Sequence, residues 1–195
     1  PTVTPEPDPA AAQWVSSGDG RWWLRYPDGS YPANERVVRD GVTYSFDANG
    51  WMKTGWQVED GAWRYYAPSG AMATGWTAVG GTWYYLDPDT GAMATGWLKD
   101  GDTWYYLNAS GAMASGWVNL GGAWFYLNSD GSMATGWAVV GGQWYYLTES
   151  GQMAIGWVKD GGSWYFCHPS GAMATGRVVI GGTAYTFDGS GRWVA

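Results

Sequence analysis

The chain has 195 residues and a net charge of −7, with 18% aromatic and only 14% charged residues. The clustered lysine and arginine that a nucleic-acid partner requires do not occur, so we expect no nucleic-acid binding. The longest apolar runs are a few residues, which predicts no membrane insertion. Ordinary domains build their core from Leu, Ile and Val, whereas 17 tryptophans and 14 tyrosines indicate a core that draws on aromatic rings.

Residues 1–10 are predicted to form a proline-rich linker. Four of the 9 prolines lie in the opening segment, at Pro1, Pro5, Pro7 and Pro9. Such segments are extended and poorly packed, as tethers between domains are. We therefore expect this chain to be the C-terminal part of a longer protein that carries an upstream domain.

Residues 11–49 are predicted to hold two atypical repeats of a motif that becomes regular further along the chain. The first contains Trp14 and the adjacent Trp22 and Trp23. The second begins near Arg36, which stands where the later repeats carry a tryptophan. Thr43 and Ser45 replace two further aromatic residues of the motif.

Residues 50–176 are predicted to form the regular array. A Gly-Trp pair recurs at spacings of 20, 21, 20, 20 and 20 residues, and a second tryptophan follows seven residues after each. All 7 methionines stand two residues after a glycine. A fixed period of about 20 residues is the signature of a repeat architecture. The Gly-Trp tryptophans are Trp56, Trp76, Trp97, Trp117, Trp137 and Trp157, and the second tryptophans are Trp63, Trp83, Trp104, Trp124, Trp144 and Trp164.

Each regular repeat is predicted to be one β-hairpin. Residues 96–99 form a first strand, residues 100–102 supply the Asp-Gly turn, and residues 103–107 alternate as a second strand. The alternation places Trp104 and Tyr106 on one side and Tyr105 on the other. A lone hairpin is marginal in water, so the hairpins must stack. The fold class is all-β, a β-hairpin solenoid of ~20-residue repeats with atypical terminal repeats.

Residues 177–195 are predicted to form the closing repeat. Arg177, Ala184 and Thr186 occupy the three positions that Arg36, Thr43 and Ser45 occupy in the early atypical repeat. An end unit of a stack must close the core on one side, so its sequence differs from the others. We interpret both atypical regions as caps.

The sequence offers no site for catalysis, a metal or a cofactor. Cys167 stands at a position filled by leucine in other repeats, and we interpret it as a small apolar substitute. His168 is the single histidine and directly follows Cys167, so the two cannot meet across a fold as a catalytic dyad. One histidine and one cysteine cannot make a zinc site either. We therefore expect a chain that is not an enzyme.

Four aromatic positions recur in each repeat, and three of them behave as a binding site. The middle aromatic persists in both caps, as a core residue would; its members are Tyr84, Tyr105, Phe125, Tyr145, Tyr165, Tyr44 and Tyr185. The two tryptophans and the last aromatic are lost together in the caps while the glycine spacing survives. Aromatic cages bind cations, above all quaternary ammonium groups. Flat rings also stack on sugars, and a purely structural stalk is a third interpretation.

The repeat Gly-x-Met-Ala-Thr-Gly-Trp followed by Gly-Gly-x-Trp-Tyr-Tyr-Leu resembles the choline-binding repeats of Gram-positive cell-wall proteins, over residues 11–195. The resemblance implies a left-handed solenoid in which choline lies between consecutive hairpins, boxed by two tryptophans of one repeat and an aromatic of the next. The implied boxes are Trp56, Trp63 and Tyr85; Trp76, Trp83 and Tyr106; Trp97, Trp104 and Tyr126; Trp117, Trp124 and Tyr146; and Trp137, Trp144 and Phe166. The sixth pair, Trp157 and Trp164, would meet Thr186 and no third ring.

The function implied by this resemblance is that of a non-catalytic anchoring module, secreted and associated with the cell wall. It would bind choline or phosphocholine on teichoic acid and target an upstream domain such as a wall hydrolase. The alternative is a repeat module that binds a glucan or another glycan. The oligomeric state stays open, with a homodimer as one alternative.

Overall fold

The structure is a computed structural model that describes residues 8–194. Residues 1–7 of the predicted linker lie outside the described residues, and Pro9–Ala11 forms a short 3-10 helix, η1. The described chain otherwise consists of strands β1 to β19 joined by turns. No helix of residues 8–194 has the length and apolar character needed to cross a membrane.

The chain divides into two compact units, residues 8–95 with 110–112 and residues 96–109 with 113–194. The strands of the first unit are β1 (Gln13–Ser16), β2 (Trp22–Arg25), β3 (Arg36–Arg39), β4 (Val42–Ser45), β5 (Gly55–Glu59), β6 (Ala62–Tyr66), β7 (Gly75–Val79) and β8 (Thr82–Leu86). Those of the second unit are β9 (Gly96–Asp100), β10 (Thr103–Leu107), β11 (Gly116–Leu120), β12 (Ala123–Leu127), β13 (Gly136–Val140), β14 (Gln143–Leu147), β15 (Gly156–Asp160), β16 (Ser163–Cys167), β17 (Gly176–Ile180), β18 (Thr183–Phe187) and β19 (Trp193–Val194).

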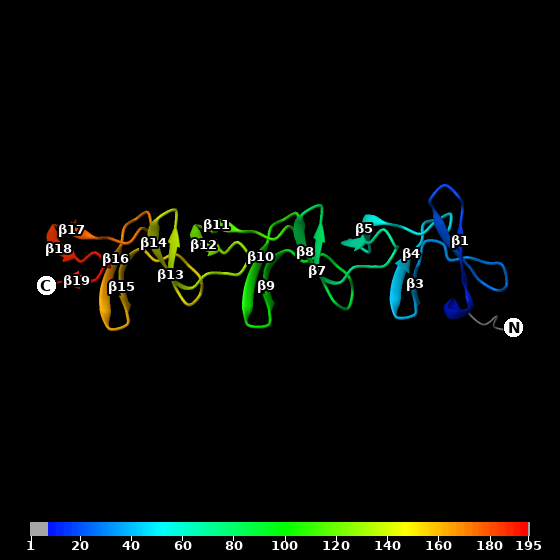
Figure 1. The fold of residues 1–195 in the computed structure, drawn as a ribbon, viewed down its shortest axis with the longest axis horizontal. Helices are drawn as coiled ribbons and strands as arrows, with labels where there is room; N and C mark the ends of the chain where they lie inside the picture. The colour runs from blue at the N-terminus through cyan, green and yellow to red at the C-terminus, as the bar shows by residue number, and fades with distance from the viewer. Residues whose placement is uncertain (1–7, 195) are drawn as a thin grey trace. The chain divides into compact units, whose positions relative to one another are not determined.

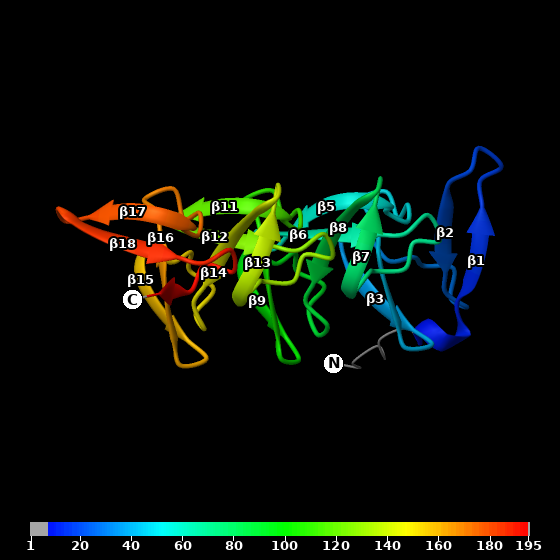
Figure 2. The same ribbon diagram turned by 60° about the vertical axis from the view of Figure 1, so that its left-hand side comes forward.

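Strands β1 to β18 form nine antiparallel hairpins, each made of an odd-numbered strand and the strand that follows it, which confirms the predicted all-β hairpin solenoid. In β9 and β10 the residue opposite Trp97 is Tyr106, and the residue opposite Trp104 is Lys99. The predicted second strand has the observed bounds, and the first strand extends by one residue to Asp100. In the second unit, hairpins β9/β10 and β15/β16 project in the same direction while the two hairpins between them project elsewhere (Figure 1, Figure 2). Three hairpins therefore complete one turn of this solenoid.

The centre of each unit is a column of fully buried side chains, one from each hairpin. In the regular repeats the contributing residue is the one that ends the second strand, a leucine in β8, β10, β12 and β14 and Tyr66 in β6, rather than the tryptophans. Cys167 takes this position in β16 and is fully buried, as predicted for a leucine substitute. Burial raises the pKa of its thiol to about 11, so the group stays a neutral thiol. The column comprises Leu24, Phe46, Tyr66, Leu86, Leu107, Leu127, Leu147, Cys167 and Phe187.

The methionine segments join successive hairpins through the backbone. The N–H of Met133, just before β13, donates to the carbonyl of Trp104 at 2.8 Å, two hairpins earlier. The next N–H, that of Ala134, donates to the carbonyl of Tyr126 in the hairpin between them, also at 2.8 Å. Met153 and Met173 repeat the pattern in the second unit. One short segment thus ties together three consecutive hairpins.

Each methionine side chain lies directly on a glycine of the following loop. The sulfur of Met113 lies so close to Gly131 that no Cβ could be added there without a shift, and Gly131 has φ +85°. This contact explains why glycine and methionine recur together with a fixed spacing. The pairs are Met52 on Gly70, Met72 on Gly91, Met93 on Gly111, Met113 on Gly131, Met133 on Gly151, Met153 on Gly171 and Met173 on Gly191.

We predict that Gly131→Ala lowers the free energy of unfolding by about 2–5 kcal/mol, because a left-handed alanine and an overpacked contact both add a cost. Gly136→Ala is the matched control, since Gly136 has φ +72° but an added Cβ meets nothing within 4 Å. It should cost only about 1–2 kcal/mol. Urea unfolding followed by circular dichroism measures both. Equal losses in the two variants would contradict the role given to the methionine contact.

Candidate functional site

The two tryptophans of each regular hairpin form two walls at right angles. Strand register places Trp104 diagonally across from Trp97, on the same face of the hairpin. Their ring centroids are 6.3 Å apart with an interplanar angle of 89°. The other hairpins with both tryptophans and a described contact repeat this geometry, at 6.3–6.5 Å and 79–87°. The sequence therefore builds the same corner of two rings in repeat after repeat.

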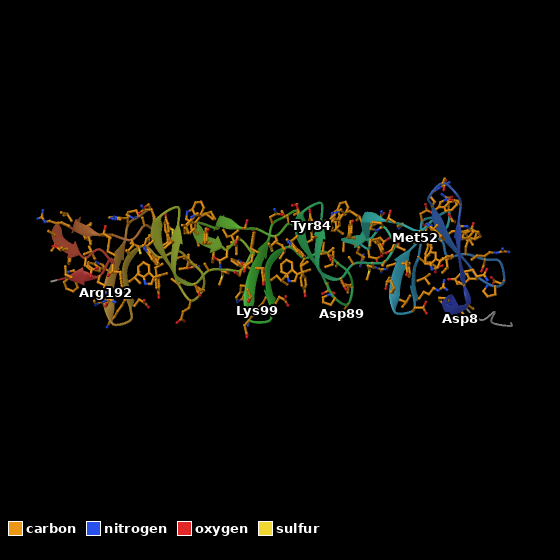
Figure 3. All side chains as sticks on the ribbon, viewed as in Figure 1. Asp8, Met52, Tyr84, Asp89, Lys99 and Arg192 are labelled. Atoms are coloured by element: carbon orange, nitrogen blue, oxygen red, sulfur yellow. The ribbon has the colours of Figure 1, made fainter. Side chains whose placement is uncertain are left out.

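The middle aromatic of the next hairpin supplies a third wall. Phe125 lies 4.9 Å from Trp97, ring centroid to ring centroid, with an interplanar angle of 66°. We call each such set of two tryptophans and the next middle aromatic a cage. The equivalent contacts are Trp56 with Tyr84, Trp117 with Tyr145, Trp137 with Tyr165 and Trp157 with Tyr185, all at 4.8–4.9 Å. Figure 3 shows one member, Tyr84, on β8.

Two of the cages in the second unit enclose open pockets. The first has a volume of ≈ 430 Å³ and is lined by Trp97, Trp104, Phe125, Met133, Glu149 and Ser150. The second has a volume of ≈ 240 Å³ and is lined by Trp117, Trp124, Tyr145, Met153 and Ser170. A methionine and a loop from two hairpins later thus complete each cage. Trp104 and Trp124 are 40% and 44% exposed, so the tryptophans are walls of a site rather than core residues.

The observed cages differ from the predicted boxes in their third ring. Sequence reasoning assigned the last aromatic of the next repeat, but this ring lies opposite the Gly-Trp tryptophan of its own hairpin, as Tyr126 does with Trp117 at 5.1 Å. Alternation places the last aromatic on the face of its own tryptophans and the middle aromatic on the opposite face, which meets the preceding hairpin. The rings concerned are Tyr85, Tyr106, Tyr126, Tyr146 and Phe166, each 5.0–5.4 Å from its own tryptophan.

The middle aromatics therefore combine two roles that the sequence interpretation separated. Phe125 and Tyr165 are both 8% exposed, as core residues are, and Phe125 also lines a pocket. For the pair Trp76 and Trp83 on β7 and β8, the predicted partner Tyr106 belongs to the second unit.

The last tryptophan pair has the third ring that sequence reasoning denied it. Tyr185, rather than Thr186, lies 4.9 Å from Trp157. The rings of Trp193 and Trp157 are 6.1 Å apart, centroid to centroid. Trp193 is the backbone register partner of Phe187, just as the methionines form β-bridges with the buried leucines. The signal was present in the sequence, because Gly191, Arg192 and Trp193 repeat the Gly-x-Met pattern with tryptophan in place of methionine.

An equivalent aromatic set in the first repeat escaped the sequence analysis. Trp14 lies 4.9 Å from Tyr44 at 66°, and the N–H of Met52 donates to the carbonyl of Trp22 at 2.7 Å. Trp14, Trp22, Tyr44 and Met52 therefore occupy the same relative positions as Trp97, Trp104, Phe125 and Met133. The hairpin loop is one residue longer here, which changes the spacing of the two tryptophans from seven to eight and hides the motif.

The Arg36 hairpin carries a polar pocket in place of a cage. The pocket has a volume of ≈ 330 Å³ and is lined by Asn34, Glu35, Arg36, Ser45, Lys53, Glu59 and Asp60. Lys53 and Tyr66 donate to the Glu59 carboxylate at 2.8 Å and 2.7 Å, and Arg36 pairs with Asp60 at 2.7 Å. Burial and then this carboxylate raise the pKa of Tyr66 to about 12. Arg36, at the position of the Gly-Trp tryptophan, thus belongs to an ion-pair cluster, and Thr43 replaces the second tryptophan, so neither ring wall is present in this repeat.

Charged side chains also reach the cages of the regular repeats. The indole N–H of Trp137 donates to the Asp160 carboxylate at 3.1 Å. The ammonium of Lys159 lies 5.7 Å from the ring centroid of Trp164. Glu149 lines the pocket at Trp97 and Trp104. Sequence repeats alone did not reveal these groups, because none of them recurs at its position in every repeat.

The Cys167 thiol is buried, and the ring of the neighbouring His168 lies beside Phe166 at 6.0 Å between centroids. Within residues 8–194, no group of three or more His, Cys, Asp and Glu side chains is arranged to hold a metal ion. The cages are the recurring pockets of these residues, and aromatic rings form their walls.

Comparison with known proteins identifies the repeats. The choline-binding repeat model matches residues 35–74, 73–116 and 114–156, and a cell wall binding repeat model matches residues 155–173. No curated protein sequence matches the chain significantly.

Several solved structures share the fold. CbpJ from Streptococcus pneumoniae TIGR4 has 35% sequence identity and a TM-score of 0.82, over 89% of this chain and 70% of that chain. The choline-binding domain of CbpL from Streptococcus pneumoniae has 33% identity and a TM-score of 0.66, over 93% of this chain and 96% of that chain. The modular autolysin LytC from Streptococcus pneumoniae, in complex with a synthetic peptidoglycan ligand, has 29% identity and a TM-score of 0.55, over 94% of this chain and 48% of that chain. Together with the repeated cages, these matches show that the chain belongs to the choline-binding repeat family of cell-wall proteins.

Proposed function

We propose that this chain anchors a protein to the cell wall by binding choline groups of teichoic acid in its aromatic cages. The observation that carries the proposal is the cage itself, two perpendicular tryptophans closed by a third ring, as in Trp97, Trp104 and Phe125. Ring faces on three sides suit a compact cation that cannot donate hydrogen bonds. The net charge of −7 also favours a cationic ligand.

Each proposed ligand site takes the middle aromatic of the next repeat as its third ring, in place of the last aromatic expected from the sequence. They comprise Trp56, Trp63 and Tyr84; Trp97, Trp104 and Phe125; Trp117, Trp124 and Tyr145; Trp137, Trp144 and Tyr165; and Trp157, Trp164 and Tyr185. Trp14, Trp22 and Tyr44 form a further candidate set. The methionine from two hairpins later, Met133 in the first pocket, adds an apolar floor.

The full-length protein is proposed to be secreted and to carry a further domain before the repeats. A polymer of the wall is met outside the membrane, so an anchor for it acts there. The modular autolysin among the similar structures is about twice as long as the part matched here, since the chain spans 48% of it. A wall-degrading domain is the kind of activity that such an anchor would hold near its substrate. The chain itself contributes binding and no catalysis.

A glycan is the alternative ligand, and the ring geometry favours choline over it. Sugars stack on one flat ring or on coplanar rings, whereas Trp117 and Trp124 stand at 87° to each other.

We predict that choline changes the tryptophan fluorescence with a saturating curve and that dextran leaves it unchanged, because only a small round cation enters the corner. Titration of the intact chain with each compound measures this. A saturating response to dextran with none to choline would reverse the assignment.

The corrected third wall gives a second prediction. Tyr145→Leu should remove choline binding at Trp117 and Trp124, because a leucine still packs as an apolar side chain but has no ring face. Tyr146→Leu is the matched control on the adjacent residue, which lies 5.0 Å from Trp137 instead. Met153 lines the Trp117 pocket, so the NMR shift of its methyl group reports on that cage. The opposite result would be that the Met153 signal no longer responds to choline in the Tyr146→Leu variant but still responds in the Tyr145→Leu variant. That result would support the box expected from the sequence, with Tyr146 as its third ring.

Weak cages can give firm attachment when several act together. One choline over a few rings gains roughly 0.5–2 kcal/mol per contact, and after the cost of capture a single site holds it at about the millimolar level. A polymer that carries many cholines fills further cages intramolecularly, which can raise avidity by about 10²–10⁴.

We therefore predict that retention on a choline-bearing resin falls more than proportionally as cages are removed. Three variants are compared. The single variant carries Trp104→Leu, the double variant adds Trp124→Leu, and the triple variant adds Trp144→Leu as well. The choline concentration needed for elution measures retention. Because salt screens desolvated contacts less than exposed charge pairs, about 0.5 M NaCl should elute less protein than choline does. If the three variants and the unmodified chain eluted at the same choline concentration, a single site outside these cages would account for the binding.

A further inference from the structure

The two open pockets of the second unit differ in one charged group. Glu149 lines the pocket formed by Trp97 and Trp104, and the corresponding loop at Trp117 and Trp124 contributes Ser170. Pro169 occupies the sequence position that Glu149 has in the other loop. The two loops share one backbone turn, since Gly151 donates to the carbonyl of Thr148 at 2.8 Å and Gly171 to that of His168 at 2.7 Å. The difference between the pockets therefore resides in the side chain.

A carboxylate at the rim of an aromatic cage adds attraction that the rings do not provide. The ring faces hold a cation through their quadrupoles, whereas a full negative charge acts over a longer range. Glu149 is solvent-exposed, so water and salt weaken its effect. The expected gain is about 3–10-fold in the dissociation constant for a quaternary ammonium ion. The same carboxylate gives no advantage to an uncharged ligand of the same shape.

Other charged groups near this cage have to be weighed against Glu149. Lys99 is the register partner of Trp104, and Asp100 and Asp102 flank the turn of the same hairpin. Lys99 opposes a bound cation, but it lies close to the hairpin tip and does not line the pocket (Figure 3). Glu149 does line the pocket, so its charge acts at shorter range and prevails.

The cage at Trp117 is a neutral reference within the same chain. Its second tryptophan, Trp124, has Asn119 as register partner, where Trp104 has Lys99. In the next cage, the Asp160 carboxylate accepts a hydrogen bond from the indole N–H of Trp137. The equivalent residue at the Trp117 cage is the uncharged Val140. The Trp117 cage thus has uncharged residues, Pro169, Asn119 and Val140, at the positions that Glu149, Lys99 and Asp160 occupy in the other cages.

We infer that Glu149 sets the specificity of the Trp97 cage and makes it the stronger site for quaternary ammonium ions relative to the Trp117 cage. The inference rests on the proposed function and refines it, because it gives one cage the role of first capture. The array then consists of unequal sites, and the polymer attaches first at Trp97 and Trp104. The Trp117 cage and its neutral equivalents fill afterwards.

Methionine methyl groups allow each cage to be followed separately in the intact chain. Met133 lines the Trp97 pocket and Met153 the Trp117 pocket. With [methyl-¹³C]methionine labelling, and signals assigned through Met133→Leu and Met153→Leu, a choline titration at low salt gives one midpoint for each cage. In the unmodified chain the Met133 midpoint should lie about 3–10-fold below the Met153 midpoint.

Three variants test the cause of this difference. Glu149→Gln keeps the size of the side chain, removes the charge and should raise the Met133 midpoint to that of Met153 or above it, because Lys99 still opposes a cation at the Trp97 cage. Pro169→Glu places a carboxylate on the matching loop and should lower the Met153 midpoint. Lys99→Gln removes the opposing charge and should lower the Met133 midpoint further. The neutral choline isostere 3,3-dimethylbutan-1-ol should bind both cages with midpoints that Glu149→Gln leaves unchanged.

The outcomes separate this inference from the proposed function. If choline shifts neither methyl signal, the proposed function fails and the inference fails with it. If choline shifts both signals and Glu149→Gln leaves the Met133 midpoint for choline unchanged, the cages bind choline and the role of Glu149 is refuted. Narrowing of the difference at about 0.5 M NaCl supports a charge effect, whereas a difference that persists unchanged at that salt concentration contradicts it.

Discussion

The seating of each methionine on the glycine of the next loop is the contact on which this molecule depends. It requires a residue without a side chain, as at Gly131, beneath a long unbranched one, as at Met113. The backbone of the methionine segment at the same time bonds to two earlier hairpins, as Met133 and Ala134 do. A single hairpin is marginally stable at best in water, so these links make a stable stack from units that are weak alone.

This arrangement leaves the tryptophans free to form a surface. The buried column uses one modest side chain per repeat, such as Leu107 or Leu127, and the rings stand outside it. Trp104 remains 40% exposed although it is among the largest apolar residues of its hairpin. A fold that needed its tryptophans as core could not hold them in open corners. The division between a buried column and aromatic walls is therefore what allows the same exposed corner of rings to recur along the chain.

Much of this could be predicted from the sequence, because the period and the turn glycines report backbone constraints directly. The hairpin at residues 96–107 and the role of Cys167 followed from residue spacing, and the repeated motif carried the resemblance to the family. The third wall of each cage did not follow. Alternation tells which rings share a face, as Trp104 and Tyr106 do, but it does not tell which face meets the preceding hairpin. Contacts between repeats decide which face meets the preceding hairpin, and the sequence of a single repeat does not show these contacts.

Departures from the consensus were harder to interpret than the consensus itself. One extra loop residue concealed Trp22, and an exchange of methionine for Trp193 concealed the last wall of the Trp157 site. Glu149 was also missed, since a group that occurs once has no period. Sequence repeats reveal what all units share, whereas differences among the sites come from residues that break the pattern.

The three-hairpin turn has a consequence for the polymer binding that we propose. Hairpins β9/β10 and β15/β16 point the same way, and the hairpins between them point elsewhere (Figure 1). A polymer that lies straight along one side of the second unit meets the tryptophans of every third repeat. One that occupies consecutive cages has to wind around the axis. The distance between cholines along the polymer, relative to the height of one turn, therefore decides whether it is held as a straight rod or as a coil.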